Sequence, residues 1–87
     1  MSKVLVRHKV ADFNKWKDGY NANATLREQA GLQEKELMQN ANDPNEVVIL
    51  FEAQDRARAE AFTNSAGLKE VMEKAGVVGK PEIIFLN

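Results

Sequence analysis

The sequence has one histidine, His8, and it is the side chain best suited to proton transfer near neutral pH. An imidazole has an unperturbed pKa of about 6.5, so its neutral form is available at pH 7 without any tuning. A neutral imidazole could act as a general base that removes a proton from a phenolic or enolic substrate. The basic neighbours Arg7 and Lys9 favour this neutral form. The alternative is a structural histidine, held by hydrogen bonds at the end of a strand.

Two charged residues, Arg7 and Glu52, could orient an anionic or carbonyl-bearing ligand. If each lies in a strand, alternation of side chains puts both on the face opposite His8. The alternative is an ion pair between Arg7 and Glu52, or a link to a second chain that fixes the register of a dimer.

Trp16 and Tyr20 lie four residues apart and share a helix face with Phe13. Such an aromatic stripe is typical of core packing. The functional alternative is a pocket between this helix and the sheet, with the Tyr20 hydroxyl as its polar group. The ligand-binding candidates are therefore Arg7, His8, Trp16, Tyr20 and Glu52, with His8 as the candidate catalytic residue.

Several chemistries are excluded by residue types that the sequence lacks. No cysteine and a single histidine exclude disulfides, thiolate nucleophiles and multi-histidine metal sites. No glycine-rich phosphate loop or Gly-x-Ser-x-Gly motif occurs. Twelve basic and thirteen acidic residues give a net charge of -1, which offers no attraction to nucleic acid or an anionic membrane. We expect no metal and no cofactor, and a hydrophobic small molecule as the ligand.

The strands that must position these residues are predicted from runs of apolar residues. Branched apolar residues predict four strands, the second being the weakest, over residues 3–10, 32–40, 46–54 and 83–86. Proline and glycine predict turns at residues 42–45 and 79–81.

Two helices are predicted between these strands. Apolar residues at helical spacing place one over residues 13–30, with a weak point near 19–23, and another over 56–75, with a break at 64–65. An aspartate that can cap the N-terminus precedes each helix, and a glycine that can end it follows.

The resulting order, β-α-β-β-α-β, indicates an α+β protein with a ferredoxin-like fold in a single domain, residues 1–87. Right-handed crossovers then place the first and third strands at the centre of a four-stranded antiparallel sheet. Both helices cover one face of the sheet, and the other face is left open.

The open face predicts a partner. The third strand is apolar on both sides, since Val47, Ile49 and Phe51 alternate with Val48 and Leu50. A contiguous apolar patch on a sheet usually marks an interface, so we expect a homodimer, sheet against sheet. The alternative is a modest patch that a monomer tolerates. An RNA-binding module of the same strand order is excluded, because the third strand has no glycine and no basic residue.

No targeting or membrane segment is evident in the sequence. The longest apolar run, residues 47–51, is far shorter than the ~20 residues that span a bilayer as a helix. The N-terminus lacks the apolar stretch of a signal peptide. We expect a cytoplasmic protein, with a periplasmic address left open if this chain is a mature form.

Three segments, residues 6–17, 42–52 and 68–83, resemble small bacterial proteins of the dimeric α/β-barrel superfamily, and together they extend along nearly the whole chain. Within this superfamily the chain is similar to antibiotic-biosynthesis monooxygenases and to small proteins labelled as polyketide cyclases. The resemblance implies a ferredoxin-like fold and a homodimer whose two sheets close a barrel. It supplies no active-site residue.

Two functions remain open at this point. The first is a cofactor-free monooxygenase or cyclase that acts on a hydrophobic or aromatic small molecule, which requires a dry pocket and a positioned proton acceptor. The second is a non-catalytic dimer that binds a small molecule as a regulatory module. An enclosed pocket with His8 in reach would favour the first.

Overall fold

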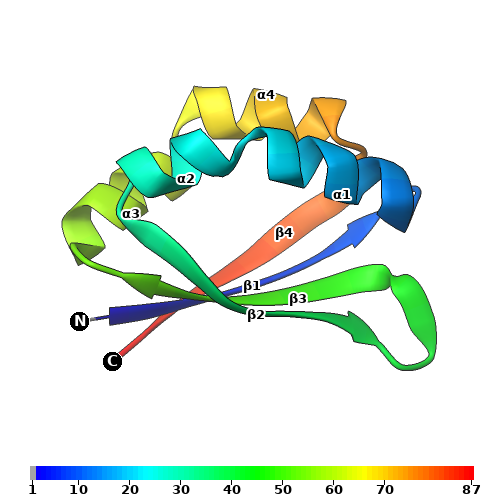
Figure 1. Cartoon of the computed structure of the whole chain (residues 1–87), viewed down its shortest axis with the longest axis horizontal. Coiled ribbons are helices and arrows are strands. Elements are labelled where there is room, and N and C mark those ends of the chain that lie inside the picture. Colours follow the sequence, from blue (N-terminus) through cyan, green and yellow to red (C-terminus); the bar gives the residue numbers. More distant parts are fainter. Residues whose placement is uncertain (1) are drawn as a thin grey trace.

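A four-stranded antiparallel sheet with helices on one face forms the described part of the chain, residues 2–87 of a computed structural model (Figure 1). In chain order the elements are β1 (Ser2–Val10), α1 (Phe13–Ala22), α2 (Ala24–Gln29), β2 (Leu32–Asn40), β3 (Asp43–Ala53), α3 (Arg56–Thr63), α4 (Ala66–Lys74) and β4 (Val77–Leu86).

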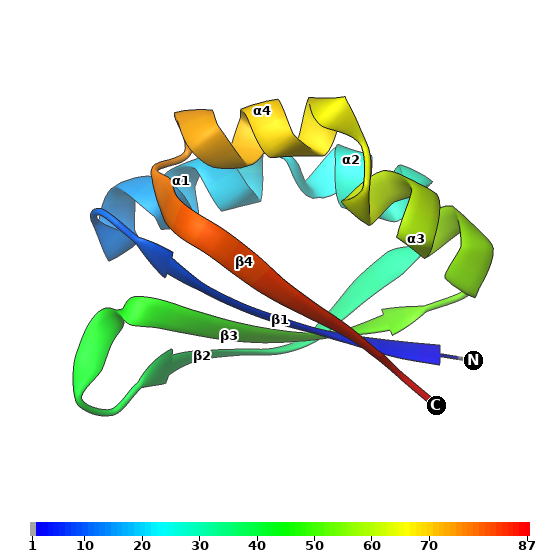
Figure 2. The same ribbon diagram turned by 180° about the vertical axis from the view of Figure 1, so that it is seen from behind.

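The sheet has the predicted ferredoxin-like topology. Its strand order is β2-β3-β1-β4, with the first and third strands at the centre, as the crossover rule requires. Val4 pairs with Phe51 and Arg7 with Val48, so the two central strands run antiparallel. All four helices lie on one side of the sheet, and both ends of the chain lie at one end of it (Figure 2).

Each predicted helix forms as two shorter helices. The side chain of Asp12 accepts a hydrogen bond from the backbone N–H of Lys15 at 3.2 Å and starts α1. The chain breaks at Asn23, inside the predicted weak point, before α2 begins. In the second half, Ser65 restarts the chain as α4 by accepting from the N–H of Leu68 at 3.1 Å.

The turn predicted at residues 42–45 is displaced. The hairpin turns at 41–42, and β3 already begins at Asp43. The side chain of Asn40 accepts a hydrogen bond from the N–H of Asn42 at 2.8 Å and closes the turn earlier than the proline suggested. Pro44 is tolerated in the strand because pairing with β1 extends only to Glu46, so no partner there requires a proline N–H.

The turn predicted at residues 79–81 is also wrong, because this segment lies inside β4. Arg7 pairs with Glu82 but Lys9 pairs with Val78, so β4 has two extra residues opposite β1 and forms a bulge. Gly79, at φ +72°, supplies a backbone conformation that other residues rarely adopt. Glycine and proline mark a bulge in an edge strand as readily as a turn.

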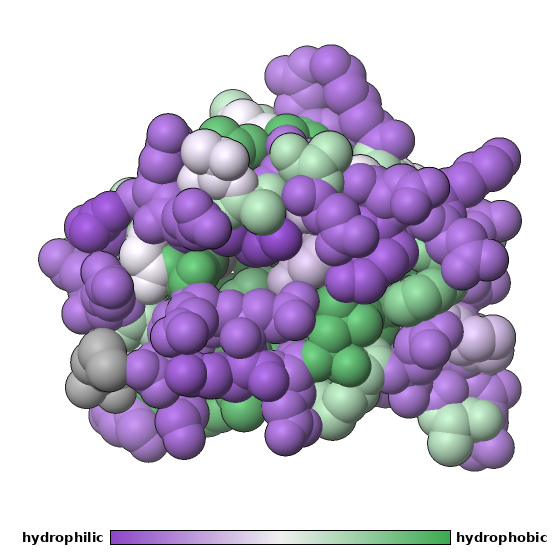
Figure 3. All heavy atoms as spheres, viewed as in Figure 1, coloured by the Kyte–Doolittle hydropathy of each residue, from purple (hydrophilic) through white to green (hydrophobic). Residues whose placement is uncertain are grey.

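The core fills the space between the sheet and the helices. It is built from alternate residues of the central strands and from Trp16 of α1, and its members include Val4, Val6, Val47, Ile49 and Phe51. Hydrophilic residues cover most of the side seen in Figure 3, with hydrophobic atoms visible between them. No helix within residues 2–87 is long and apolar enough to cross a bilayer.

The face of the sheet opposite the helices carries exposed apolar residues. Ile84 is 46 % exposed, Leu86 41 % and Met38 40 %, and Val48 and Leu50 are half-buried beside them. The alternation predicted for the third strand is therefore correct: Ile49 and Phe51 are buried under the helices, and Val48 and Leu50 face away.

Candidate functional site

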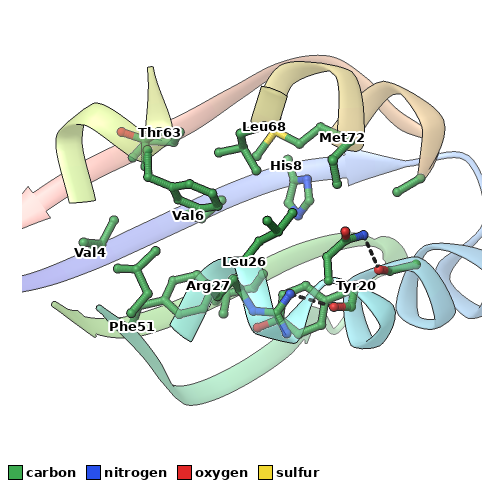
Figure 4. A pocket seen from close by; sticks show the side chains of 18 of the residues that line it. Val4, Val6, His8, Tyr20, Leu26, Arg27, Phe51, Thr63, Leu68 and Met72 are labelled. Carbon is green, nitrogen blue, oxygen red and sulfur yellow. Dashed lines mark hydrogen bonds between the residues drawn. The ribbon is translucent and has the colours of Figure 1, made fainter. Parts of the chain in front are cut away.

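A cavity of about 80 Å³ lies between the helices and the sheet (Figure 4). The sheet contributes Val4 and Val6 from β1 and Ile49 and Phe51 from β3. The helices contribute the opposite walls, α1 and α2 on one side and α3 and α4 on the other. This lining is almost entirely apolar, so a polar group that faces the cavity has few partners for its hydrogen bonds.

His8 is such a group. Strand alternation places it on the helix-covered face with Val4 and Val6, and it is only 6 % exposed. Neither ring nitrogen has a hydrogen-bond partner among residues 2–87. His8 therefore lacks, within these residues, the hydrogen bonds that would hold a structural histidine. Burial lowers the pKa of His8, because the protonated ring would lose its hydration. The imidazole is therefore neutral at pH 7, with a free acceptor nitrogen.

The bulge in β4 lies directly beside His8. Regular pairing between β1 and β4 stops at Arg7 and resumes at Lys9, so His8 is the residue opposite the interruption. Bulges often redirect a neighbouring side chain or the strand beside a functional site.

Trp16 and Tyr20 extend the wall from His8 along α1. The rings of His8 and Trp16 meet edge to face with centroids 5.3 Å apart, and Trp16 stacks on Tyr20 at 4.9 Å. Both aromatic residues line the cavity. The stripe therefore serves both as core packing and as part of the cavity wall.

The Tyr20 hydroxyl does not point at the cavity as a free polar group. It donates to Oε1 of Glu34 at 2.7 Å. Burial and this bond raise the pKa of Tyr20 above its ordinary value, so the phenol stays protonated. The Arg27 guanidinium lies over the same ring, 3.6 Å from its centroid, and donates to the backbone oxygen of Tyr20 at 2.6 Å.

Arg7 lies on the other face of the sheet. It lines a shallow hollow of about 490 Å³ together with Met38, Val48 and Ile84. Its Nε donates to Oε1 of Glu46 at 2.5 Å. This bond and the charge of Glu46 raise the pKa of Arg7.

Glu46 is the buried anchor of this network. Its other oxygen accepts from Nδ2 of Asn40 at 2.7 Å. The bonds from Asn40 and Arg7 lower the pKa of Glu46, which stays ionised. The expected ion pair between Arg7 and Glu52 is absent from the described residues. The strand register explains this, because it pairs Arg7 with Val48 and places Glu52, four residues further along β3, opposite Lys3.

The five predicted site residues are thus divided between two faces. His8, Trp16 and Tyr20 share the cavity under the helices, whereas Arg7 and Glu52 lie on the open face. Glu52 contacts Nζ of Lys35 at 4.0 Å and lines neither hollow. The division follows from the two-residue period of a strand, which sends neighbours such as Arg7 and His8 to opposite sides.

Sequence reasoning missed Arg27, which lines the cavity, and Glu34, which holds Tyr20. Arg27 follows Tyr20 by seven residues, two helical turns, and this spacing was the available signal. Glu34 had no comparable signal, because a bulge in β2 between Glu34 and Glu36 shifts which residues face the helices. Within residues 2–87, no three His, Cys, Asp or Glu side chains cluster as metal ligands would.

Comparisons with known proteins agree with this architecture. No protein-family model and no curated protein matches the sequence. Among solved structures, an antibiotic biosynthesis monooxygenase is similar over 100 % of this chain and 97 % of its own, at 16 % identity and a TM-score of 0.72.

Two further structures give the same result. SnoaB, a cofactor-independent oxygenase from Streptomyces nogalater, matches over 99 % of this chain and 90 % of its own, at 12 % identity and a TM-score of 0.72. An uncharacterized NIPSNAP domain protein from Burkholderia xenovorans matches over 100 % and 93 %, at 12 % identity and a TM-score of 0.68. At such identities the likeness establishes the fold. The chain therefore has the ferredoxin-like fold of antibiotic biosynthesis monooxygenase structures, as its sequence resemblance implied.

Proposed function

We propose that this protein is a cofactor-independent oxygenase that acts on a hydrophobic aromatic molecule with a phenolic or enolic hydroxyl. One observation carries the proposal: His8 is a buried, neutral imidazole whose ring nitrogens have no partner among residues 2–87, and it faces a cavity whose walls are mostly apolar. A base of this kind can accept a proton from a bound hydroxyl without competition from neighbouring side chains. SnoaB, which shares the fold, supports the assignment of the reaction class.

In the proposed reaction the substrate supplies the electrons. His8 accepts the hydroxyl proton, and the resulting phenolate or enolate is electron-rich enough to reduce dioxygen. A ring CH₂ group and O₂ become a carbonyl and water: carbon is oxidised, one oxygen atom stays on the substrate, and the other leaves with both hydrogens. An apolar site favours this chemistry because it excludes water from the reactive anion.

The size of the cavity adds a requirement. A cavity of about 150 Å³ holds one benzene ring, so the present volume of about 80 Å³ is too small for even a single aromatic ring. The helix pairs must therefore separate when the substrate enters. The breaks at Asn23 and at residues 64–65 give each helix pair a point at which it can bend.

We further propose that the protein works as a homodimer joined through the open face of its sheet. The exposed side chains of Ile84, Leu86 and Met38 and the half-buried Val48 and Leu50 form an apolar area around the Arg7–Glu46 pair. Apolar residues, methionine and arginine are enriched in the buried cores of protein interfaces. A dimer would close the hollow at Arg7 into the interior of a barrel.

Oxygen uptake by the purified protein tests the reaction. Hydroxylated naphthalenes and anthrones serve as substrates, measured with an oxygen electrode, with a product analysis for the new carbonyl. Replacement of His8 with glutamine should lower kcat by about 10²- to 10⁴-fold, the usual contribution of a general base. Lys3→Gln, an exposed change on the same strand, is the matched control.

Three outcomes contradict the proposal. Uptake that the His8→Gln variant retains in full removes His8 from the mechanism. A wild-type protein that consumes no oxygen with any of these substrates excludes the oxygenase. Conversion of a polyketide-like substrate into a ring-closed isomer without oxygen uptake would identify a cyclase that uses the same base.

A further inference from the structure

We infer that Arg27 selects the substrate, and that the cavity takes aromatic molecules that carry a carboxylate or similar anionic group. Arg27 is the single charged side chain among the described residues that line the cavity. The inference rests on the proposed function for the identity of the site. It adds a chemical class of ligand that His8 alone does not define.

Arg27 stands where the cavity reaches the surface. Its neighbour Leu26 lines the cavity and is also 39 % exposed, so the wall opens to solvent at this point of α2. Figure 4 shows Leu26 and Arg27 on one side of the cavity and Thr63 and Leu68 on the other. A ligand that enters between the helix pairs therefore passes the guanidinium before it reaches His8.

The guanidinium is held in place but keeps donors free. One of its nitrogens, Nη1, donates to the backbone oxygen of Tyr20, and its plane lies over the Tyr20 ring. These two contacts fix its position with a single hydrogen bond, whereas a guanidinium has five N–H donors. No carboxylate within residues 2–87 lies at ion-pair distance from Arg27. Glu34, which is exposed, accepts a hydrogen bond from the Tyr20 hydroxyl.

The spatial order of the groups then defines the ligand. The positive charge lies at the mouth, the stacked rings of Tyr20 and Trp16 follow, and the neutral imidazole of His8 lies at the inner end. A planar ring with an anion at one end and a hydroxyl at the other matches this order. Paired N–H donors of arginine favour a carboxylate, which accepts two parallel hydrogen bonds.

A binding experiment without oxygen separates this inference from the reaction. The probes are para-hydroxybenzoate and para-hydroxybenzamide, which have the same shape and hydroxyl and differ in charge. Trp16 is the only tryptophan, so its indole N–H gives one NMR signal that reports occupation of the cavity. We expect the wild type to bind the benzoate about fivefold to tenfold more tightly than the benzamide, with the preference reduced by salt.

Two variants distinguish recognition from structure. Arg27→Gln should abolish the preference and leave the affinity for the benzamide within about twofold of the wild type. Arg58→Gln is the matched control, because Arg58 also donates to a backbone oxygen, that of Gln29, but does not line the cavity. The preference should survive in Arg58→Gln.

The inference is overturned by any of three results. The first is equal affinity of the wild type for the two probes. The second is an equal loss of affinity for both probes in Arg27→Gln, which is what a purely structural role of Arg27 predicts. The third is the absence of any change in the Trp16 signal with either probe. Selective binding without oxygen uptake would refute the oxygenase and leave the inference standing. Oxygen uptake without a preference for the charged probe would refute the inference about Arg27 and leave the proposed oxygenase standing.

Discussion

The rings of His8 and Trp16 pack edge to face, with centroids 5.3 Å apart and an angle of 75° between the planes. His8 comes from β1 and Trp16 from α1, and both are buried. The contact supports the imidazole with an aromatic surface and occupies neither of its nitrogens. Its position is therefore fixed by packing, and its proton chemistry stays available.

This burial predicts a dependence of stability on pH. Because the pKa of His8 is lowered in the folded protein, the unfolded chain takes up a proton at a pH where the folded chain does not. The free energy of unfolding should be unaffected by His8 above about pH 6.5 and should fall as the pH drops below it. The loss cannot exceed about 1.4 kcal/mol per pH unit for one group.

The His8→Leu variant isolates this effect. Since the chain has no other histidine, the variant should lack the loss of stability between about pH 6.5 and pH 5 that the wild type shows. Urea denaturation across this range measures both proteins. Parallel curves for the two would mean that His8 protonates as easily in the folded chain as in the unfolded chain.

The floor of the cavity is also the core, so its truncation should be costly. Phe51 is 4 % exposed and Ile49 2 %, and both line the cavity. Replacement of either by alanine should lower the free energy of unfolding by about 2–5 kcal/mol, because the enlarged cavity stays unfilled. Val78→Ala, at a position that is 48 % exposed, should cost less than about 0.5 kcal/mol. A loss below about 1 kcal/mol at Phe51 would contradict the burial described here.

Two glycines should respond to alanine in opposite directions. Gly67 lies in α4 with nothing within 4 Å of an added Cβ, so Gly67→Ala should stabilise the protein by about 0.5 kcal/mol through helix propensity. Gly76 has φ +88°, so Gly76→Ala should destabilise it by about 1–2 kcal/mol. Thermal melts of the two variants should therefore move to either side of the wild type. Stabilisation by Gly76→Ala would show that the helix does not end in this conformation.

The proposed dimer predicts the behaviour of a charge placed on the open face. Ile84→Glu changes a side chain that is 46 % exposed in the single chain, so the fold of one subunit should tolerate it. A carboxylate buried between two copies should instead dissociate them. Sedimentation velocity at micromolar concentration should show a dimer for the wild type and a folded monomer for the variant. A wild-type monomer, or a dimer that the variant preserves, would exclude this interface.

Periodicity sufficed to predict the sheet and its two faces. The alternation of Val47, Ile49 and Phe51 with Val48 and Leu50 separated these residues into two faces of β3, and the structure agrees. Local signals were less decisive at the ends of elements. Pro44 predicted a turn, but the Asn40 side chain closes the hairpin two residues earlier.

The site was predicted only in part, because it depends on long-range pairing. His8, Trp16 and Tyr20 converge because one strand and one helix pack together, which amphipathic patterns imply. The partner of Arg7 depends on strand register, which no local pattern encodes, so Glu52 was named where Glu46 lies. Arg27 lines the cavity from α2, one of the two short helices that form in place of the single predicted helix.

The bulge in β4 specifies the alignment of a strand whose composition does not. Ile83 and Phe85 pack toward the core, while Ile84 and Leu86 face outward, so a slip by one residue would exchange two equally apolar sets. Hydrophobicity alone therefore gives no strong preference between the two alignments. Gly79, with its left-handed backbone, locates the bulge at one place along the chain and makes only one alignment continuous with β1. The choice of which face of β4 packs on the core therefore depends on Gly79, a residue that has no side chain.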